Sequence, residues 1–190
     1  AIAGRELSDT MNTFQIVFIR SLVGFAIVLV VAGAKDSTLF RTARLKIHLI
    51  RNVLHYSAQA GWFLGVSLLP LATVFAIEFT TPIWVALMAV WFLGEKLNRG
   101  RWVAILCGFG GTLIILRPGL AVFDVGSMAV LWAAIGFASA YIFTKVLFDS
   151  DSPITILLYM TGIQAIIGLV PGLVVWVELG VEDLIWILFV

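Results

Sequence analysis

Apolar residues occur in six long, nearly continuous runs, which short polar segments separate. The runs lie near residues 14–33, 49–69, 71–93, 101–117, 126–147 and 154–177, and a seventh begins at about Leu184. A bilayer core takes about 20 mostly apolar residues per helix, so each of the six runs has about the length of one crossing. None of them alternates between apolar and polar positions as a strand of a membrane β-barrel does. The pattern predicts an all-α membrane protein, a polytopic helix bundle with six full spans.

Composition narrows the class of protein further. Of the 190 residues, 62% are hydrophobic and only 12% are charged, whereas soluble domains carry about 25% charged residues. This balance excludes a soluble enzyme, a disordered regulator and a nucleic-acid-binding module. The single cysteine, Cys107, excludes a disulfide framework and a thiolate zinc site, and we expect no cofactor. Because the chain begins at Ala1 without an initiator methionine and ends within an apolar run, we expect it to be an internal piece of a longer protein.

Lysine and arginine are distributed unevenly between alternate connectors. Nine of them flank the first, third and fifth loops, namely Lys35, Arg41, Arg44, Lys46, Arg51, Lys96, Arg99, Arg101 and Lys145. The other connectors hold Arg117, and the leading segment holds Arg5. Since cytoplasmic loops carry an excess of these residues, we predict that the first, third and fifth loops are cytoplasmic.

An internal repeat is suggested when the chain is shifted against itself by 140 residues. Residues 5–17 then align with 145–157, and a charged helix end is followed in both places by a short polar turn and a new apolar run. The similar pairs are Arg5 with Lys145, Leu7 with Leu147, Asp9 with Asp149 and Ile16 with Ile156. One repeat would then contain five helices, and an odd number places the second copy upside down in the membrane. The alternative is a set of six or seven unrelated spans.

One carboxylate lies inside an apolar run. Glu78 is eight residues into the third run, about 12 Å deep at about 1.5 Å per residue. The ring of Pro82 is expected to remove the hydrogen bond to the Glu78 carbonyl and to break the helix, with Thr81 beside the break. Transporters place substrates and coupling ions at broken helices of this kind. The alternative is a structural kink, in which Glu78 is neutral or paired.

Arg20 is a second charge within a run, six residues into the first. Two interpretations are equally supported. Arg20 pairs with Glu78 at a compatible depth, or its side chain extends toward the outer interface.

The second run has two distinct faces. His48, Arg51, His55, Gln59 and Trp62 fall within an arc of about 80° at 100° per residue. Ser57, Gly61 and Gly65 form a small-residue ridge on another side, which favours close helix packing. We predict that His55 and Gln59 line a cavity, with a satisfied interhelical hydrogen bond as the alternative, and that His48 and Arg51 meet water. No acidic residue or cysteine on this helix completes a metal site with the two histidines. In the fourth run, Gly108, Gly110 and Gly111 are expected to allow close packing.

The stretch from Thr80 to Gly119 resembles the signature hairpin of the EamA type of the drug/metabolite transporter superfamily. The matching elements are Pro82, Gly94-Glu95, Arg101-Trp102, the Gly108/Gly111 helix and Arg117-Pro118-Gly119, together with Phe18-Ile19-Arg20 and Leu69-Pro70. The resemblance implies ten helices in two inverted five-helix repeats. We expect residues 1–119 to form the first repeat without most of its first helix, and residues 120–190 to form the start of the second. The resemblance also implies transport of small metabolites through a central cavity. The surroundings of Glu95 favour a structural ion pair for that residue.

These observations lead to one functional hypothesis. We predict an alternating-access transporter of a small metabolite or drug-like solute, coupled to protons, in the bacterial inner membrane, and not an enzyme. The expected pathway residues are Arg20, His55, Gln59, Trp62, Glu78, Thr81 and Pro82. The expected partners are the solute and the lipid bilayer, with no nucleic acid and no metal. The alternatives are an intramembrane enzyme or lipid-handling bundle that uses the same polar cavity, and a bundle that only scaffolds a partner.

Overall fold

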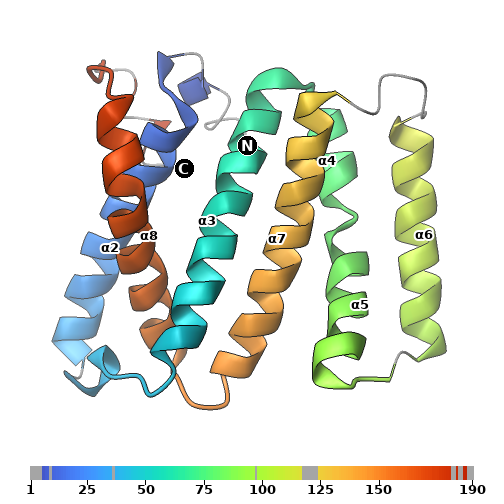
Figure 1. Cartoon of the computed structure of the whole chain (residues 1–190), viewed down its shortest axis with the longest axis horizontal. Helices are drawn as coiled ribbons and strands as arrows, with labels where there is room; N and C mark the ends of the chain where they lie inside the picture. Colours follow the sequence, from blue (N-terminus) through green and yellow to red (C-terminus); the bar gives the residue numbers. More distant parts are fainter. Residues whose placement is uncertain are drawn as a thin grey trace. The chain divides into compact units, whose positions relative to one another are not determined.

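The computed structural model describes residues 6–8, 10–35, 37–96, 98–116, 124–180, 183 and 186–187. Over this part of the chain the secondary structure is helical, without strands, which confirms the predicted all-α class (Figure 1). The elements are α2 (Thr13–Lys35), the 3₁₀ turn η1 (Ser37–Phe40), α3 (Leu45–Leu68), α4 (Leu71–Glu78), α5 (Thr81–Leu93), α6 (Arg99–Leu116), α7 (Val125–Leu147) and α8 (Pro153–Val174). Arg5 and the Arg117-Pro118-Gly119 motif lie outside the described residues, as does the predicted boundary between repeats at 119/120.

Helices occupy all six predicted runs, but they differ in apolar character. Four stretches are long and apolar enough to cross a membrane: Thr13–Lys35, Leu71–Leu93, Val125–Leu147 and Pro153–Val174. In α6 the apolar stretch is shorter, Trp102–Gly111. The 24-residue helix α3 is less apolar than these four stretches, because polar side chains occur along its length.

The third predicted span is two helices rather than one. α4 ends at Glu78 and α5 begins at Thr81, so the chain is interrupted where Pro82 was expected to break it. Two backbone hydrogen bonds between residues three positions apart bridge the interruption. Thr80 N donates to the Ile77 carbonyl at 3.0 Å, and Ile83 N donates to the Thr80 carbonyl at 2.9 Å. At its other end α5 stops at Gly94, whose φ of 66° is a left-handed conformation that glycine adopts without strain.

The chain forms two compact units. Unit 1 comprises Ala1–Tyr56 and Phe143–Val190, and unit 2 comprises Ser57–Ile142. Both α3 and α7 are therefore shared, each contributing one part to each unit.

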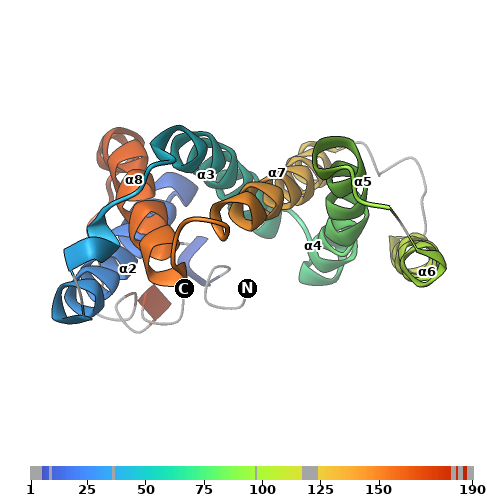
Figure 2. The ribbon, with the colours of Figure 1, turned by 90° about the horizontal axis from the view of Figure 1, so that it is seen from below.

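In unit 1, α2 and α8 pack side by side, as both views show (Figures 1 and 2). Phe18 of α2 lies against Gly168 and Gly172 of α8, where an added Cβ at Gly172 would come within 2.8 Å of the Phe18 Cβ. Small residues on α8 therefore determine how closely these two helices approach each other.

In unit 2, the buried core contains Val66 of α3, Leu69 directly after that helix, Val74 and Ile77 of α4, and Val130 of α7. The predicted ridge on α3 packs there: a Cβ at Gly61 would lie 2.7 Å from the Ala129 carbonyl oxygen, and one at Gly65 would clash with Val130. Close packing was also expected at the glycines of α6. That expectation is wrong for the part of the chain that the structure describes, because a Cβ at Gly108, Gly110 or Gly111 would meet no described atom within 4 Å.

The two turns that the 140-residue offset aligns have matching hydrogen bonds. Met11 N bonds to the Leu7 carbonyl at 2.8 Å, and Asp151 N bonds to the Leu147 carbonyl at 2.8 Å. The hydroxyls of Thr10 and Ser150 donate to the same two carbonyls. After these turns α2 begins at Thr13 and α8 begins at Pro153. The arrangement of whole five-helix repeats stays a prediction.

Candidate functional site

The polar face of α3 is buried. His48 and Asn52 are fully buried, Gln59 is 3% exposed and Arg51 is 6% exposed. The expectation that His48 and Arg51 meet water is therefore wrong. Both side chains instead find partners on α7, on α8 and in the turn between them.

Four residues of unit 1 form a connected group, which we call the α3–α8 polar cluster: Arg51, Asn52 and His55 of α3, and Gln164 of α8. The Gln164 amide Nε2 donates to Asn52 Oδ1 at 3.2 Å and contacts His55 Nδ1 at 3.0 Å. Because an amide nitrogen is a donor, Nδ1 of His55 accepts and the ring proton lies on Nε2. This is the interhelical hydrogen bond that was the alternative interpretation of His55.

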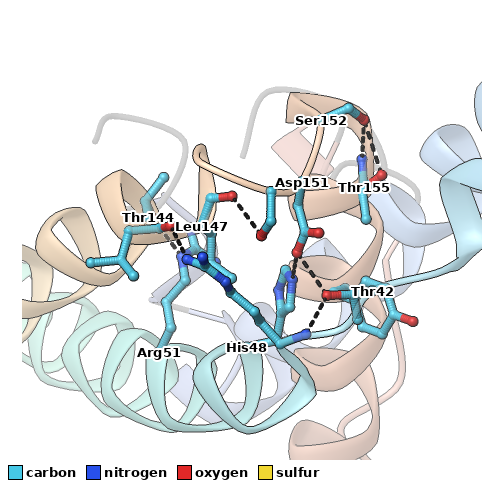
Figure 3. A network of polar contacts seen from close by, with 12 residues as sticks. Thr42, His48, Arg51, Thr144, Leu147, Asp151, Ser152 and Thr155 are labelled. Carbon is cyan, nitrogen blue, oxygen red and sulfur yellow. Dashed lines mark hydrogen bonds and ion pairs between the residues drawn. The ribbon is translucent and has the colours of Figure 1, made fainter.

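Arg51 is held by neutral acceptors. Its Nε donates to Thr144 Oγ1 at 2.7 Å, Nη1 donates to Asn52 Oδ1 at 3.0 Å, and Nη2 lies 3.5 Å from Met160 Sδ. The guanidinium thus connects α3 to α7 through Thr144 (Figure 3), and to α8 through Met160, inside unit 1.

A second polar group closes one end of unit 1. His48 Nε2 donates to Asp151 Oδ2 at 2.8 Å, and the Thr42 hydroxyl donates to the same oxygen at 2.7 Å (Figure 3). Burial by itself raises the pKa of Asp151, but the hydrogen bonds from His48 and Thr42 outweigh this and hold that pKa below its ordinary value. The first and fifth loops therefore meet at the same end of unit 1, as their shared positive charge predicted.

In unit 2, two of the predicted pathway residues meet. The Trp62 indole Nε1 donates to Glu78 Oε2 at 2.7 Å, so a side chain of α3 binds the carboxylate at the end of α4. Next to the interruption, the Thr80 hydroxyl donates to the Ile77 carbonyl at 2.7 Å. The Thr81 hydroxyl is buried and has no hydrogen-bond partner among the described residues.

Arg20 lies on α2 in unit 1 and is partly buried. It makes no ion pair or hydrogen bond within the described part of the chain. Its predicted pairing with Glu78 stays a prediction, because these two residues belong to different units. Unit 1 thus holds Arg20 and His55, and unit 2 holds Gln59, Trp62, Glu78, Thr81 and Pro82.

Asn52 and Asp151 are the residues that sequence reasoning missed. Asn52 lies four positions after His48 and three before His55, a helical spacing that places it on the same face. That signal was available in the sequence. Asp151, in a polar turn, gave no signal of its own.

Comparison with known proteins gives a consistent picture. Residues 1–117 match the model of the family described as EamA-like transporter family. An S-adenosylmethionine uptake transporter of Rickettsia bellii is 27% identical over 168 residues, covering 88% of this chain and 58% of the relative. A riboflavin transporter of Vibrio cholerae is 30% identical over 176 residues, covering 90% of this chain and 59% of the relative. A pseudopaline exporter of Pseudomonas aeruginosa is 28% identical over 136 residues, covering 72% of this chain and 46% of the relative.

The chain therefore spans less than three fifths of the length of these curated relatives. A protein of known crystal structure shares the fold with a TM-score of 0.68 at 14% identity, over 98% of this chain and 69% of its own. The family and its apolar helices indicate an integral membrane protein. All three relatives are named as transporters and none as an enzyme, so the enzyme alternative gains no support.

Proposed function

This chain belongs to the EamA-like transporter family, and we propose that the protein containing it carries a small organic solute across a bacterial inner membrane. Relatives named for S-adenosylmethionine uptake, riboflavin transport and pseudopaline export support a small organic molecule as the solute. All of them come from bacteria, which supports the inner membrane as the location.

The observation that carries this proposal is the polar interior of helices whose remaining surface is apolar. Polar and charged side chains are costly inside a membrane, and they mark solute and ion pathways when they face a bundle interior. On α3 these side chains are buried, while Leu49, Ile50 and Val53 of the same helix are exposed. A helix with this distribution turns its polar side inward and its apolar side toward lipid.

Each unit holds residues that we propose for the pathway, and each set is considered by itself. Unit 1 contributes Arg20 and His55 beside Gln164. Unit 2 contributes Gln59, Trp62, Glu78, Thr81 and Pro82. The helix is interrupted there between Glu78 and Thr81, and the Pro82 nitrogen has no hydrogen to donate to the Glu78 carbonyl. We assign contact with the solute to these side chains.

Alternating access between two inverted repeats is the proposed mechanism. The repeats would comprise residues 1–119 and 120–190 of this chain. Matching hydrogen bonds in the turns at residues 7–11 and 147–151 support this division. In such a mechanism one repeat moves against the other around a site in the middle of the membrane.

Glu78 is the proposed proton carrier. It is the only carboxylate within the six apolar runs, and the Trp62 indole holds one of its oxygens. A carboxylate that gains and loses a proton during each cycle would couple solute movement to a proton gradient.

Uptake by the full-length protein in proteoliposomes tests the function. We expect accumulation of at least one member of a labelled metabolite library that includes S-adenosylmethionine and riboflavin, and stimulation by an imposed proton gradient. Glu78→Gln is expected to abolish that stimulation, whereas Glu178→Gln, at an exposed carboxylate beyond α8, is expected to leave it unchanged. Accumulation of no library member would refute transport, and an unchanged pH dependence in Glu78→Gln would refute the role of Glu78.

A further inference from the structure

An apolar groove lies between α2 and α8 on the surface of unit 1. It has a volume of about 300 Å³, and its lining includes Phe25 and Leu29 of α2, Phe40 of η1 and Ile166 of α8. The side chains of Leu29, Phe40 and Ile166 are exposed, so the groove opens outward from the described part of this unit. Because α2 and α8 are long and apolar enough to cross a membrane, a groove along them lies where lipid tails lie.

The groove follows the direction of the helices. Its lining residues on α8 begin at Leu158 and end at Ile166, a span of about 12 Å at about 1.5 Å per residue. Gly162 lies between them, and a Cβ there would come within 3.0 Å of the Phe25 ring. Gly162 thus lets this ring lie close to the α8 backbone. The surface that results is elongated and apolar, as an extended acyl chain requires.

Arg41 is held at one end of the groove. Phe40, which precedes it, lines the groove, and the Phe40 carbonyl accepts a hydrogen bond from the Tyr159 hydroxyl at 2.9 Å. Thr42, which follows it, donates to Asp151 Oδ2 at 2.7 Å. The backbone on both sides of Arg41 is therefore tied to α8 and to the turn before it. The Arg41 side chain is exposed, and it makes no hydrogen bond or ion pair among the described residues.

The same end of unit 1 carries more basic than acidic residues. Lys35 is exposed at the end of α2, about 9 Å along the helix from Leu29 at about 1.5 Å per residue. The loops and helix ends here hold five basic residues and three aspartates, namely Lys35, Arg41, Arg44, Lys46, Lys145, Asp36, Asp149 and Asp151. Asp151 is bound by His48 and Thr42, and Asp36 lies outside the described residues. The apolar groove thus ends at a region of net positive charge.

We propose that unit 1 binds an anionic phospholipid, with one acyl chain in this groove and the headgroup phosphate at Arg41 and Lys35. A planar guanidinium matches a phosphate through two parallel hydrogen bonds, and a lysine adds a second positive charge. Basic sites beside membrane helices bind anionic headgroups in this way. The inference goes beyond the proposed function, because lipid binding requires no transport.

Charge favours a lipid over another helix as the occupant of the groove. This end of unit 1 is the one predicted to be cytoplasmic, and the cytoplasmic ends of membrane helices are rich in lysine and arginine. A further helix in the groove would therefore bring like charge toward Arg41 and Lys35. An anionic lipid brings an apolar chain to the groove and the opposite charge to its end.

Lipid binding by the purified full-length protein tests the proposal. Apparent Kd values are measured by native mass spectrometry for dioleoyl phosphatidylglycerol, which is anionic, and for dioleoyl phosphatidylcholine, which has the same acyl chains and no net charge. One basic residue near the surface favours an anionic lipid about fivefold, so with two of them we expect phosphatidylglycerol to bind about five- to thirtyfold more tightly. Equal Kd values for the two lipids overturn the proposal.

Charge variants locate the headgroup. Arg41→Gln and Lys35→Gln are each expected to raise the Kd for phosphatidylglycerol about fivefold and to leave that for phosphatidylcholine unchanged. Arg99→Gln is the matched control, because Arg99 is an exposed arginine at the start of α6 in unit 2, and it should bind both lipids as the wild type does. An equal loss in Arg99→Gln would reflect net charge alone and overturns the site. If Arg41→Gln does not fold, an unchanged Kd in Lys35→Gln overturns it.

A groove variant locates the acyl chain. Leu29→Trp places a larger side chain in the groove and is expected to abolish binding of both lipids, and Ile166→Trp replaces it if it does not fold. Val30→Trp, at an exposed neighbour outside the groove lining, should bind as the wild type does. Unchanged binding in the groove variant overturns the proposal, as expected if another part of the full-length protein or a second copy covers the groove. Displacement of phosphatidylglycerol by an equal concentration of glycerol 1-phosphate also overturns it, because the headgroup alone would then bind.

Discussion

The indole nitrogen of Trp62 donates a 2.7 Å hydrogen bond to the carboxylate of Glu78, connecting α3 to the end of α4 inside unit 2. The residues are 16 positions apart and become neighbours because Leu69 and Pro70 close a tight hairpin between their helices. The carboxylate is thus held next to the interruption at Phe79 and Thr80. The carboxylate is hydrogen-bonded to a neighbouring helix, as the structural-kink alternative has it, and the role of Glu78 in a pathway stays a prediction.

Removing the indole donor tests the value of this contact. We expect Trp62→Phe to lower the free energy of unfolding by about 1.5–3 kcal/mol, the usual range for a hydrogen bond to a charged group. We also expect it to reduce uptake by the full-length protein. Trp91→Phe is the control, because Trp91 is 75% exposed in the same unit. Equal stability and uptake in the two variants would contradict the prediction.

The bond between Gln164 and Asn52 is expected to couple α8 to α3. Gln164→Leu removes the donor shared by Asn52 and His55. We expect a loss of about 1–3 kcal/mol because both acceptors lose this bond, although Asn52 Oδ1 keeps its bond from Arg51 Nη1. In a double-mutant cycle with Asn52→Leu, the double variant should lose less than the sum of the single variants, by about 0.5–3 kcal/mol. Strictly additive losses in thermal or denaturant unfolding would show that the contact contributes nothing.

Helix contact in unit 2 depends on the small residues of α3. Gly61→Ala places a Cβ 2.7 Å from the Ala129 carbonyl oxygen, and backbone cannot move aside cheaply. We expect a loss of about 1–3 kcal/mol in unfolding free energy. Gly33→Ala is the matched control on α2, where a Cβ meets no described atom within 4 Å. The control should be neutral or gain about 0.5–1 kcal/mol from its better helix propensity, and the prediction fails if both variants change stability alike.

The Asp151 carboxylate should make stability depend on pH at the acidic end. Because the pKa of Asp151 is lowered in the folded protein from its ordinary value of 3.8, its contribution is complete above pH 3.8. The contribution is lost as pH falls through the lowered folded value. Asp151→Asn should therefore melt at a lower temperature than the wild type near pH 7, and the difference should shrink as pH falls below 3.8 toward the lowered folded pKa.

Asp149→Asn is the control for this pH series, since Asp149 is exposed in the same turn. Melting curves recorded between pH 7 and pH 3 should show the narrowing difference for Asp151→Asn alone. A difference that stays constant down to pH 3 would mean that Asp151 contributes through shape rather than through its charge.

Helix positions, the interruption near Pro82 and the small-residue ridge on α3 were all predictable from the order of residues. Each depends on neighbours within one or two turns: the length of an apolar run, a proline ring four residues from a carbonyl, or glycines at helical spacing. The family resemblance drew on the same local features. The local pattern did not predict exposure correctly. His48 and Arg51 lie near a helix end and were expected to meet water, yet both are buried.

Partner choice among the polar side chains was decided by the tertiary structure. Gln164 meets Asn52 across 112 positions of the chain, and Asp151 meets His48 across 103. Many polar pairs could satisfy one another at such separations, and no local rule selects among them. Packing of α3 against α7 and α8 selects them, because a polar group buried in an apolar helix bundle must bond to whatever polar group that packing brings within reach.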